Sequence, residues 1–292
     1  MEPSHVIDLS IAGIGIRMET EKPLIQEESF RPFLVPEQDP QFTAVFRRVE
    51  QLPEIPERVL YEGSCFRVHP DGRGGYVRSF FDAPRDFTPY ALAEYDYPHG
   101  KIRVNYLEKG EKCVSETSNC FFHLGLEAMM LEKQRLILHA SCVRTPMGGI
   151  LFSGPSGIGK STQAKLWCAH RGGELINGDR TILSRDGDSW LGWGSPYAGS
   201  SRCYVNDCVN VRCVVMLKQA KSNGIRRLGP GEAFRKIFSG LTVYSWDRTY
   251  TEAACDLALQ LVRQVPVYEL GCTADASAVE FLEKYCMGER GL

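Results

Sequence analysis

The sequence predicts an α/β fold with a β-rich N-terminal region, and three observations lead to this prediction. Residues 5–115 consist of short strand-like runs separated by turns and a proline-dense stretch. Residues 116–292 alternate apolar strand-like runs with helical patterns, which is typical of a sheet covered by helices. A glycine-rich segment, FSGPSGIGKST (152–162), lies between one such strand and the helix after it. We therefore expect two parts, covering residues 1–115 and 116–292.

Length and charge restrict the class of protein. The chain has 292 residues, of which 43% are hydrophobic and 24% charged, and its formal net charge is −2. A chain of this size has room for a large buried core. Its nearly neutral, well-mixed charge does not favour binding to nucleic acid or to an anionic membrane. No apolar run approaches the roughly 18 residues that a membrane span needs. We expect neither a nucleic-acid partner nor a membrane.

The cysteines indicate a reduced protein. The chain has 11 of them, an odd number, scattered along the sequence with no C-x-x-C pair. This pattern supports neither a zinc knuckle nor a thioredoxin-type motif. The first residues, MEPSHVIDLS, have no basic stretch followed by an apolar core, so no signal peptide is expected. The expected protein is cytoplasmic, and most of its cysteines are small core residues.

The first part is expected to be built from short strands. GGYVRSFF (74–81) and GKIRVNYLEKG (100–110) are strand-and-turn segments, and FTAVFRRVEQL (42–52) fits either a strand or a short helix. AGIGI (12–16) contains part of a dinucleotide-binding fingerprint. It lacks the third glycine and the following helix, so we interpret its glycines as those of a hairpin or strand.

The second part is expected to begin with a helix over 115–132, where apolar residues recur at helical spacing after Ser and Thr caps. The run 135–145 is a strand, 146–149 a turn and 150–152 an apolar strand. The expected later elements are helices at 161–172, 230–241, 251–264 and 275–286, and strands at 208–220 and 265–270.

The segment after the apolar strand matches a phosphate-binding loop. Gly154 is followed by four residues and then by Gly159-Lys160-Ser161. Glycines allow the backbone conformations that turn amide groups toward phosphates, and the helix that follows adds its positive end. Lys160 would reach the β- and γ-phosphates and Ser161 would ligate Mg²⁺. The expected nucleotide-binding residues are Gly154, Pro155, Ser156, Gly157, Ile158, Gly159, Lys160, Ser161 and Thr162. The alternative is an ordinary glycine-rich turn between a strand and a helix.

A nucleotide site also needs an acidic residue for the metal, usually at the end of a neighbouring strand. Asp179 follows the short strand 174–176 and precedes Arg180, so it is the candidate for Mg²⁺, directly or through a water molecule. The alternative is that Asn177-Gly178-Asp179 is a hairpin turn, which the Asn-Gly pair favours.

The run LHASCVRTPMGGILFSGPSGIGKSTQAKLW, together with INGDR, resembles the catalytic domain of HPr kinase/phosphorylase. It also resembles HPr-kinase-like kinases found near peptide-modification genes and, more distantly, the nucleotide core of PEP carboxykinase. The resemblance covers roughly residues 135–285 and includes WGSPYAGSS (193–201). It implies a PEP-carboxykinase-like P-loop nucleotide-binding domain that uses ATP and Mg²⁺. The catalytic residues that it implies are His139, Lys160, Asp179 and Arg180.

The sequence departs from that family at one position. The family has two aspartates before the arginine, and the first is described as the base that takes the proton of the acceptor hydroxyl. Gly178 stands there in this chain. His139 and Asp247 are the candidates to replace the base, and His139 could equally be a hydrogen-bonded core histidine. The family's glycine-rich HPr-recognition segment is not recognisable, so the expected acceptor is not HPr.

Several polar residues have two interpretations. Arg180, Arg202, Arg226 and Arg227 could hold phosphate, but solvation at the surface is favoured for the last two. Ser195, Ser200 and Ser201 could line an acceptor pocket or form a polar loop. Trp167, Trp190 and Trp193 are expected to be packing residues and not residues on which nucleic-acid bases stack.

The expected function is that of an ATP-dependent kinase. It would transfer the γ-phosphoryl group to a hydroxyl of a serine or threonine in a peptide or protein, or of a small metabolite. The alternative is a catalytically weak or inactive ATP-binding module that regulates a partner protein. A decarboxylating carboxykinase is disfavoured because no ligand set for a second metal is visible. The acceptor is unidentified, and a homo-oligomer is left open.

Overall fold

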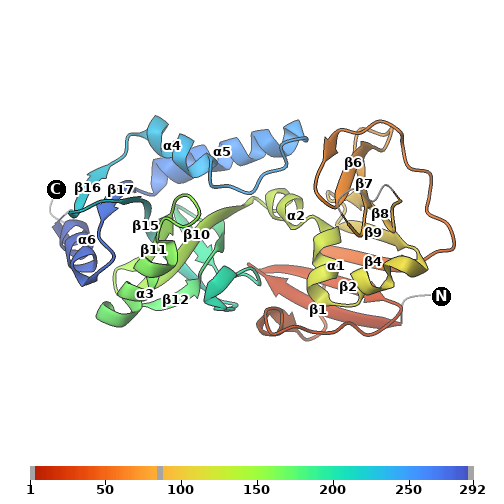
Figure 1. Cartoon of the computed structure of the whole chain (residues 1–292), viewed down its shortest axis with the longest axis horizontal. Coiled ribbons are helices and arrows are strands. Elements are labelled where there is room, and N and C mark those ends of the chain that lie inside the picture. The colour runs from red at the N-terminus through yellow and green to blue at the C-terminus, as the bar shows by residue number, and fades with distance from the viewer. Residues whose placement is uncertain (1–3, 84–87, 289–292) are drawn as a thin grey trace. The chain divides into compact units, whose positions relative to one another are not determined.

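The computed structural model describes residues 4–83 and 88–288, and it is a mixed α/β structure with two sheets. The chain forms two compact units (Figure 1). The first comprises Met1–Lys133 with Tyr244–Arg248, and the second comprises Gln134–Val243 with Thr249–Leu292. The short segment 244–248 therefore packs with the first unit although the chain on both sides of it belongs to the second.

The first unit contains a nine-stranded sheet in the order β3-β1-β2-β4-β9-β8-β7-β6-β5. Its strands are β1 (His5–Ile11), β2 (Ile14–Thr20), β3 (Leu34–Val35), β4 (Phe42–Arg48), β5 (Tyr61–Glu62), β6 (Phe66–Pro70), β7 (Tyr76–Phe80), β8 (Ala91–Asp96) and β9 (Lys101–Tyr106). Its helical segments are η1 (Arg31–Phe33), η2 (Glu108–Val114), α1 (Thr117–Leu124) and α2 (Leu126–Glu132).

Alternation along the strands determines which face of this sheet is buried. In β4, Phe42, Ala44 and Phe46 are at most 1% exposed, whereas Thr43 and Arg47 point to the opposite face. A period of two is that of a half-buried strand, so the run for which strand and helix were both open is a strand. The AGIGI segment is a hairpin, as expected, because Ala12 and Gly13, both with positive φ, join β1 to β2.

The helix expected over 115–132 is interrupted at Gly125. Gly125 has φ +72° and ends α1 and begins α2. Around it, Tyr97 donates its hydroxyl hydrogen to the carbonyl of Leu124 at 2.8 Å. The buried guanidinium of Arg78 lies 4.6 Å from the ring centre of Tyr244, which belongs to the segment that returns to this unit. The helical period was visible in the sequence, but this close approach of distant residues was not.

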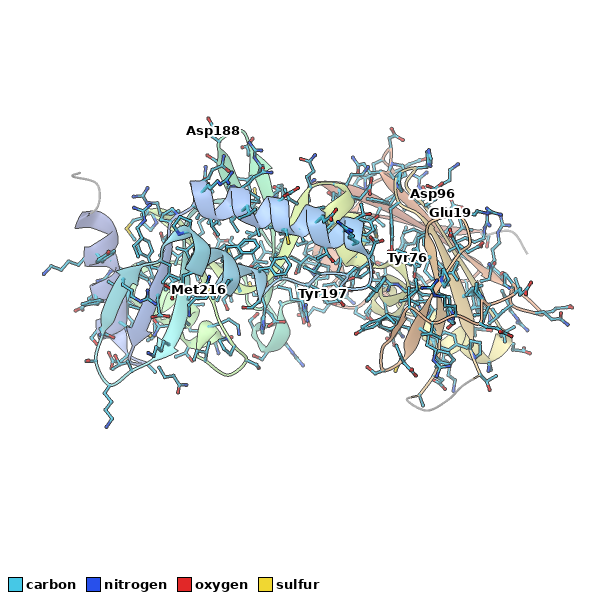
Figure 2. All side chains as sticks on the ribbon, turned by 90° about the horizontal axis from the view of Figure 1, so that it is seen from above. Glu19, Tyr76, Asp96, Asp188, Tyr197 and Met216 are labelled. Carbon is cyan, nitrogen blue, oxygen red and sulfur yellow. The ribbon has the colours of Figure 1, made fainter. Side chains whose placement is uncertain are left out.

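The second unit contains a sheet in the order β11-β10-β13-β14-β15-β17-β16, with β12 paired to β10. Its strands are β10 (Arg135–Thr145), β11 (Gly148–Ser153), β12 (Glu174–Asn177), β13 (Arg180–Asp186), β14 (Ser189–Trp193), β15 (Cys208–Gln219), β16 (Gly224–Arg227) and β17 (Val267–Cys272). Its helical segments are α3 (Lys160–Arg171), η3 (Gly199–Ser201), α4 (Pro230–Phe238), α5 (Arg248–Gln264) and α6 (Ala276–Gly288). Figure 2 shows Asp188 at the exposed tip of the turn between β13 and β14.

Parallel pairing positions the glycine-rich segment in this unit. β11 pairs in parallel with β15, and β15 pairs in parallel with β17. Because β11 also pairs with β10, the path through β10, β13, β14 and β15 closes on itself. A core that includes Phe152, Trp167 and Val215 fills the space between these strands and α3. The glycine-rich segment thus follows the buried strand β11 and leads into the helix α3, as the sequence predicted.

The ten cysteines whose side chains are described are all free. Cys120, Cys142 and Cys213 are buried and the other seven are half-buried, so the expectation of mostly core cysteines holds for these three alone. Cys286 lies outside the residues whose side chains are described. Among residues 4–83 and 88–288, no helix combines the length and the apolar character that crossing a bilayer requires.

Gly125→Ala is expected to destabilise the first unit. A Cβ atom there would lie 2.3 Å from the hydroxyl oxygens of Tyr97 and Tyr244 and 2.6 Å from Nη2 of Arg78. The left-handed conformation costs about 1–2 kcal/mol, and overpacking adds about 1–3 kcal/mol. Urea unfolding should show a loss of about 2–5 kcal/mol in the free energy of unfolding. Gly72→Ala is the matched control, because Gly72 has φ +73° with nothing within 4 Å. Equal losses in the two variants would contradict the packing argument.

Candidate functional site at the glycine-rich loop

The glycine-rich loop has the backbone conformation that its sequence requires. It connects β11, whose last five residues are buried, to α3, which begins at Lys160. Gly154, Gly157 and Gly159 have φ values of +142°, +76° and +114°. Residues with side chains rarely adopt these values, so the three glycines are needed for the path of the loop. The loop leads into the N-terminus of α3, where unpaired amides and the helix dipole favour an anion.

The amino group of Lys160 lies against the inner side of this loop. Its Nζ atom donates to the carbonyl oxygens of Gly154 and Pro155, at 3.1 Å each. The residue is only 7% exposed. Burial lowers the pKa of Lys160, and the carboxylate of Asp179 partly opposes this shift. Lys160 therefore places a cation inside the loop, within electrostatic range of Asp179.

The other loop residues differ in exposure. Pro155, Ser156, Gly157 and Thr162 are exposed, and Ser161 is half-buried. Ile158 is half-buried and packs against the core of the unit. The loop is thus anchored by Ile158 on one side and open to solvent on the other.

Asp179 lies at a break in a strand edge rather than in a hairpin. β12 and β13 both pair antiparallel with β10, one after the other. The register of β10 shifts between His139 and Ala140 and again between Cys142 and Val143. Gly178 and Asp179 connect the end of β12 to the start of β13 beside these shifts. The hairpin alternative for Asn177-Gly178-Asp179 was therefore wrong, because the two strands that flank it do not pair with each other.

Hydrogen bonds to β10 and within the turn hold Asp179 in place. The amide of Ala140 donates to the carbonyl of Asp179 at 2.9 Å, and Ser141 Oγ donates to the carbonyl of Gly178 at 2.8 Å. The amide of Asp179 donates to Oδ1 of Asn177 at 2.8 Å. Local side-chain bonds of this kind favour a turn over continued strand pairing.

His139 and Asp179 are brought together. His139 Nε2 lies 3.0 Å from Oδ1 of Asp179, and the histidine side chain is 35% exposed, so it is not a core histidine. Burial and the positive charge of Lys160 lower the pKa of His139, and Asp179 opposes them. A neutral ring with its proton on Nε2 donates to the carboxylate and fixes its orientation.

Arg180 lies beside the His139–Asp179 pair, but its closest hydrogen bond is to Thr242. Its Nε is 3.9 Å from Oδ2 of Asp179, while its Nη1 donates to Oγ1 of Thr242 at 2.7 Å. The side chain is 44% exposed. Three of the sequence-predicted catalytic residues, His139, Arg180 and Lys160, therefore interact with the carboxylate of the fourth, Asp179.

The position where the resembling family has an acid is closed. A Cβ atom on Gly178 would lie 2.1 Å from Oγ and 2.4 Å from Cβ of Ser201. Ser201 is fixed there because its hydroxyl donates to the carbonyl of Ala198 at 2.6 Å and accepts from the amide of Cys203 at 3.2 Å. Gly178 does not have a positive φ, so packing against Ser201, and not backbone conformation, excludes a side chain.

Sequence reasoning missed the structural role of two residues that shape this turn. Asn177 is fully buried and donates to Oγ of Ser195 at 3.1 Å, and Ser195 donates to the carbonyl of Arg180 at 2.7 Å. Ser195 was considered for an acceptor pocket, but its hydroxyl is buried and supports the turn. The only signal for Asn177 in the sequence was its place two residues before Asp179, which suits an Asx-type turn.

Of the remaining candidates, some are paired or packed within the second unit and one belongs to the first unit. Arg226 is paired with Glu232 and Glu269, consistent with the surface interpretation. Trp167 and Trp190 are buried core residues, and Trp193 donates to Ser184 at 2.8 Å. Asp247 belongs to the first unit, whereas the other candidates belong to the second.

The residues fit a phosphate group with its metal. The described residues contain no group of three or more His, Cys, Asp or Glu side chains that could hold a metal ion by itself. Mg²⁺ often takes only one or two carboxylates and completes its shell with water and phosphate oxygens. The Ser161 hydroxyl makes no hydrogen bond within the described chain, and a Cβ atom on Gly157 or Gly159 would meet nothing within 4 Å. The loop is therefore open where phosphates would lie.

The chain was compared with protein-family models, with curated proteins and with solved structures. No protein-family model matches the chain, and no curated protein matches it. Among solved structures it is similar to an Hpr(Ser) kinase/phosphatase from Coxiella burnetii, with 12% identity and a TM-score of 0.34. The match covers 53% of this chain and 99% of the other. At this TM-score the likeness supports no statement on function.

The pKa of His139 is expected to lie below the ordinary value of about 6.5 and to move in opposite directions in two variants. Lys160→Ala removes a positive charge and should raise it, whereas Asp179→Asn removes the opposing carboxylate and should lower it further. Side-chain NMR titration, assigned with His139→Gln, measures both shifts. Because the folded state then binds fewer protons than the unfolded state, this group makes the protein less stable as pH falls from about 6.5 toward the folded pKa. Shifts of the same sign would contradict this electrostatic arrangement.

Gly178→Ala is expected to lower the free energy of unfolding by about 1–3 kcal/mol, because its Cβ atom would overlap Ser201. Ser201→Gly removes both atoms involved, so the same change should cost less in that background. A double-mutant cycle by urea unfolding measures the difference. Gly224→Ala, where a Cβ atom meets nothing within 4 Å, is the matched control in the same unit. An unchanged cost in the Ser201→Gly background would show that Ser201 is not the obstacle.

Proposed function

We propose that the second unit is a P-loop domain of the PEP-carboxykinase-like type that binds Mg-ATP at Gly154–Thr162. It transfers the γ-phosphoryl group to a hydroxyl of a serine or threonine in a peptide or protein, or of a small metabolite. One observation carries the proposal. The Lys160 amino group lies inside a loop shaped by three left-handed glycines and within electrostatic range of Asp179.

Lys160 is poised to exchange one set of hydrogen-bond acceptors for another. Its ammonium group now donates to the carbonyls of Gly154 and Pro155. Phosphate oxygens on the open side of the loop offer stronger, charge-assisted bonds to the same group. Binding a nucleotide therefore leaves no buried cation without a partner, and it reverses the lowering of the lysine pKa by burial.

Ser161 and Asp179 would hold Mg²⁺, which neutralises charge on the transferred phosphoryl group. The Asp179 carboxylate is oriented by His139 Nε2 at 3.0 Å, and its backbone is fixed by Ala140 and Asn177. A carboxylate that cannot rotate freely keeps its second oxygen directed toward the site. We assign His139 a positioning role through this contact.

Arg180 would contact a phosphoryl oxygen or the acceptor. One terminal nitrogen is engaged by Thr242, and the guanidinium remains 44% exposed. Its planar fork suits oxygens of a phosphoryl group. The hydroxyl proton would pass to the His139–Asp179 pair, since Gly178 carries no acid. Positioning and charge neutralisation contribute more to phosphoryl transfer than the base does, so this arrangement is compatible with turnover.

A second candidate function is a nucleotide-binding module with little or no transfer activity. The contact of Gly178 with Ser201 favours it, because the turn leaves no room for an acid at the family's base position. In that case ATP would order the loop and the Asp179 turn for a partner protein.

Calorimetric titration of Mg-ATP, followed by phosphate-release assays on the same samples, tests the proposal. We expect binding that is about ten- to a hundredfold weaker in Lys160→Ala, because a charge-assisted hydrogen bond is worth about 1.5–3 kcal/mol. Lys165→Ala, an exposed lysine on the same helix, is the matched control. Binding with slow phosphate release supports the kinase, and binding without any release supports the module. Absence of binding in the wild type would overturn both.

A further inference from the structure

Strand pairing places Thr242 and Arg180 on one face of the second unit's sheet, on opposite edges of β10. On one edge, His139 of β10 pairs with Arg180 of β13. On the other edge, the amide of Thr242 donates to the carbonyl of Ile137 at 2.9 Å, beside an isolated antiparallel bridge, so Thr242 lies opposite Ile137. Side chains of paired residues, and of residues two apart in a strand, share a face. The four side chains therefore lie on the same face.

The side chain of Arg180 crosses β10 to reach Thr242. Neighbouring strands lie about 4.8 Å apart, and Nη1 of Arg180 donates to Oγ1 of Thr242 at 2.7 Å. The Nε atom lies 3.9 Å from Oδ2 of Asp179. The Nη2 atom makes no hydrogen bond with a residue that the structure describes. The guanidinium is thus held at one end by Thr242, lies near Asp179, and keeps one nitrogen available to a ligand.

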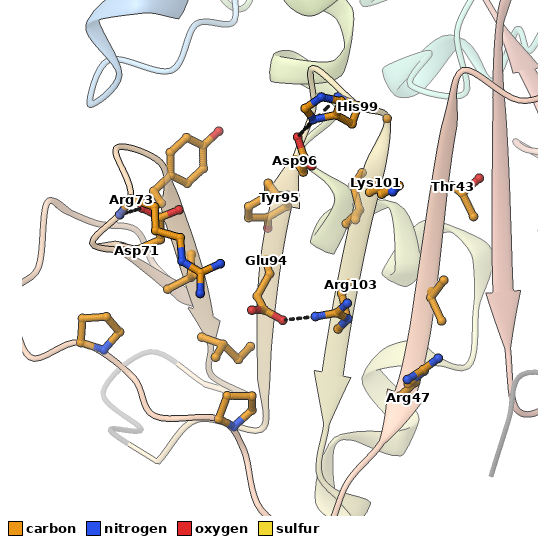
Figure 3. A pocket seen from close by; sticks show the side chains of 18 of the residues that line it. Thr43, Arg47, Asp71, Arg73, Glu94, Tyr95, Asp96, His99, Lys101 and Arg103 are labelled. Atoms are coloured by element: carbon orange, nitrogen blue, oxygen red, sulfur yellow. Dashed lines mark hydrogen bonds and ion pairs between the residues drawn. The ribbon is translucent and has the colours of Figure 1, made fainter.

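Two other exposed arginines are held by carboxylates. Arg103 pairs with Glu94 at 3.3 Å in a groove of the first unit (Figure 3), and Arg226 pairs with two glutamates. Each of these pairs neutralises the charge of the arginine. The closest acceptor of Arg180 is instead a neutral hydroxyl, which orients the guanidinium without neutralising it. The carboxylate of Asp179, at 3.9 Å, remains available to a metal ion.

The backbone around Thr242 is fixed to the strand that also carries His139. The amide of His139 donates to the carbonyl of Gly240 at 2.9 Å, and the hydroxyl of Ser153 donates to the carbonyl of His139 at 2.9 Å. A Cβ atom on Gly240 would lie 3.2 Å from Cδ1 of Leu138, so this segment packs closely on β10. Groups supported by strands are placed more precisely than groups on loops. Thr242 is therefore a firm anchor for a long, otherwise exposed side chain.

We propose that Thr242 is a positioning residue that holds the Arg180 guanidinium where charge develops on the γ-phosphoryl group. This inference rests on the proposed function. In that function the glycine-rich loop and Lys160 hold the phosphates of bound ATP, and Arg180 acts on the charge that spreads over the γ-phosphoryl oxygens during transfer. Thr242 itself touches no substrate. Loss of its hydroxyl should therefore lower the rate at saturation more than the affinity for Mg-ATP.

Calorimetric titration of Mg-ATP and phosphate-release assays on the full chain compare the wild type with Thr242→Val and Thr242→Ser. Valine has the shape of threonine without the hydroxyl, so the fold should be kept, and thermal unfolding checks this. We expect Thr242→Val to lower the rate of phosphate release at saturating Mg-ATP by about tenfold and to change the dissociation constant by less than about threefold. Thr242→Ser keeps the hydroxyl and should recover most of the rate. In an Arg180→Gln background, Thr242→Val should cause no further loss.

NMR relaxation of the Nε–H group of Arg180, assigned with Arg180→Gln, tests the contact without a nucleotide. We expect its order parameter to fall in Thr242→Val and to be restored in Thr242→Ser. An order parameter that Thr242→Val leaves unchanged would overturn the inference. Equal rates in Thr242→Val and the wild type, or a further loss in the Arg180→Gln background, would do the same. If the wild type neither binds Mg-ATP nor releases phosphate, the proposed function fails first, and the role of Thr242 in transfer fails with it.

Discussion

The candidate site depends on one constraint in strand β10, which must pair with two strands in succession along the same edge. β13 pairs with residues 135–140 and β12 with residues 142–144, so the two strands follow each other and cannot be continuous. Buried backbone groups at such a break need other partners. The amide of Ala140 and the hydroxyl of Ser141 supply them by bonding the carbonyls of Asp179 and Gly178. The same register shift places His139 beside the Asp179 carboxylate. The Asp179 carboxylate and the His139 imidazole are thus adjacent because β10 changes register where its pairing passes from β13 to β12.

β10 also connects this break to the glycine-rich loop. β11, which leads into the loop, is its other neighbour, and Ser153 at the end of β11 donates to the carbonyl of His139 at 2.9 Å. The loop and the Asp179 turn therefore have their origins on two sides of a single strand. This is why the charge of Asp179 acts on the pKa of Lys160 although the two residues are far apart in sequence. A rigid strand is a more precise support for such a site than a loop would be.

The parts of this arrangement that depend on local sequence could be predicted, and those that depend on distant contacts could not. The glycine spacing, the strand before it and the helix after it placed the loop correctly, because glycine conformation and hydrophobic period are local properties. Asp179 was selected for its position after a strand. The exclusion of a side chain at Gly178 comes from Ser201, and the break of the helix at Gly125 involves Tyr244. Neither contact leaves a periodic signal. The same holds for Asn177, whose buried amide is satisfied by Ser195.

The cations of the second unit already have partners within the chain, and this bears on the kind of ligand that they would bind. In the second unit Lys160 is satisfied by loop carbonyls, Arg180 by Thr242 and Arg226 by two glutamates. Cations that already have partners must exchange them on binding, which favours ligands with several strong acceptors, such as a triphosphate. A compact, strongly held anion suits this situation.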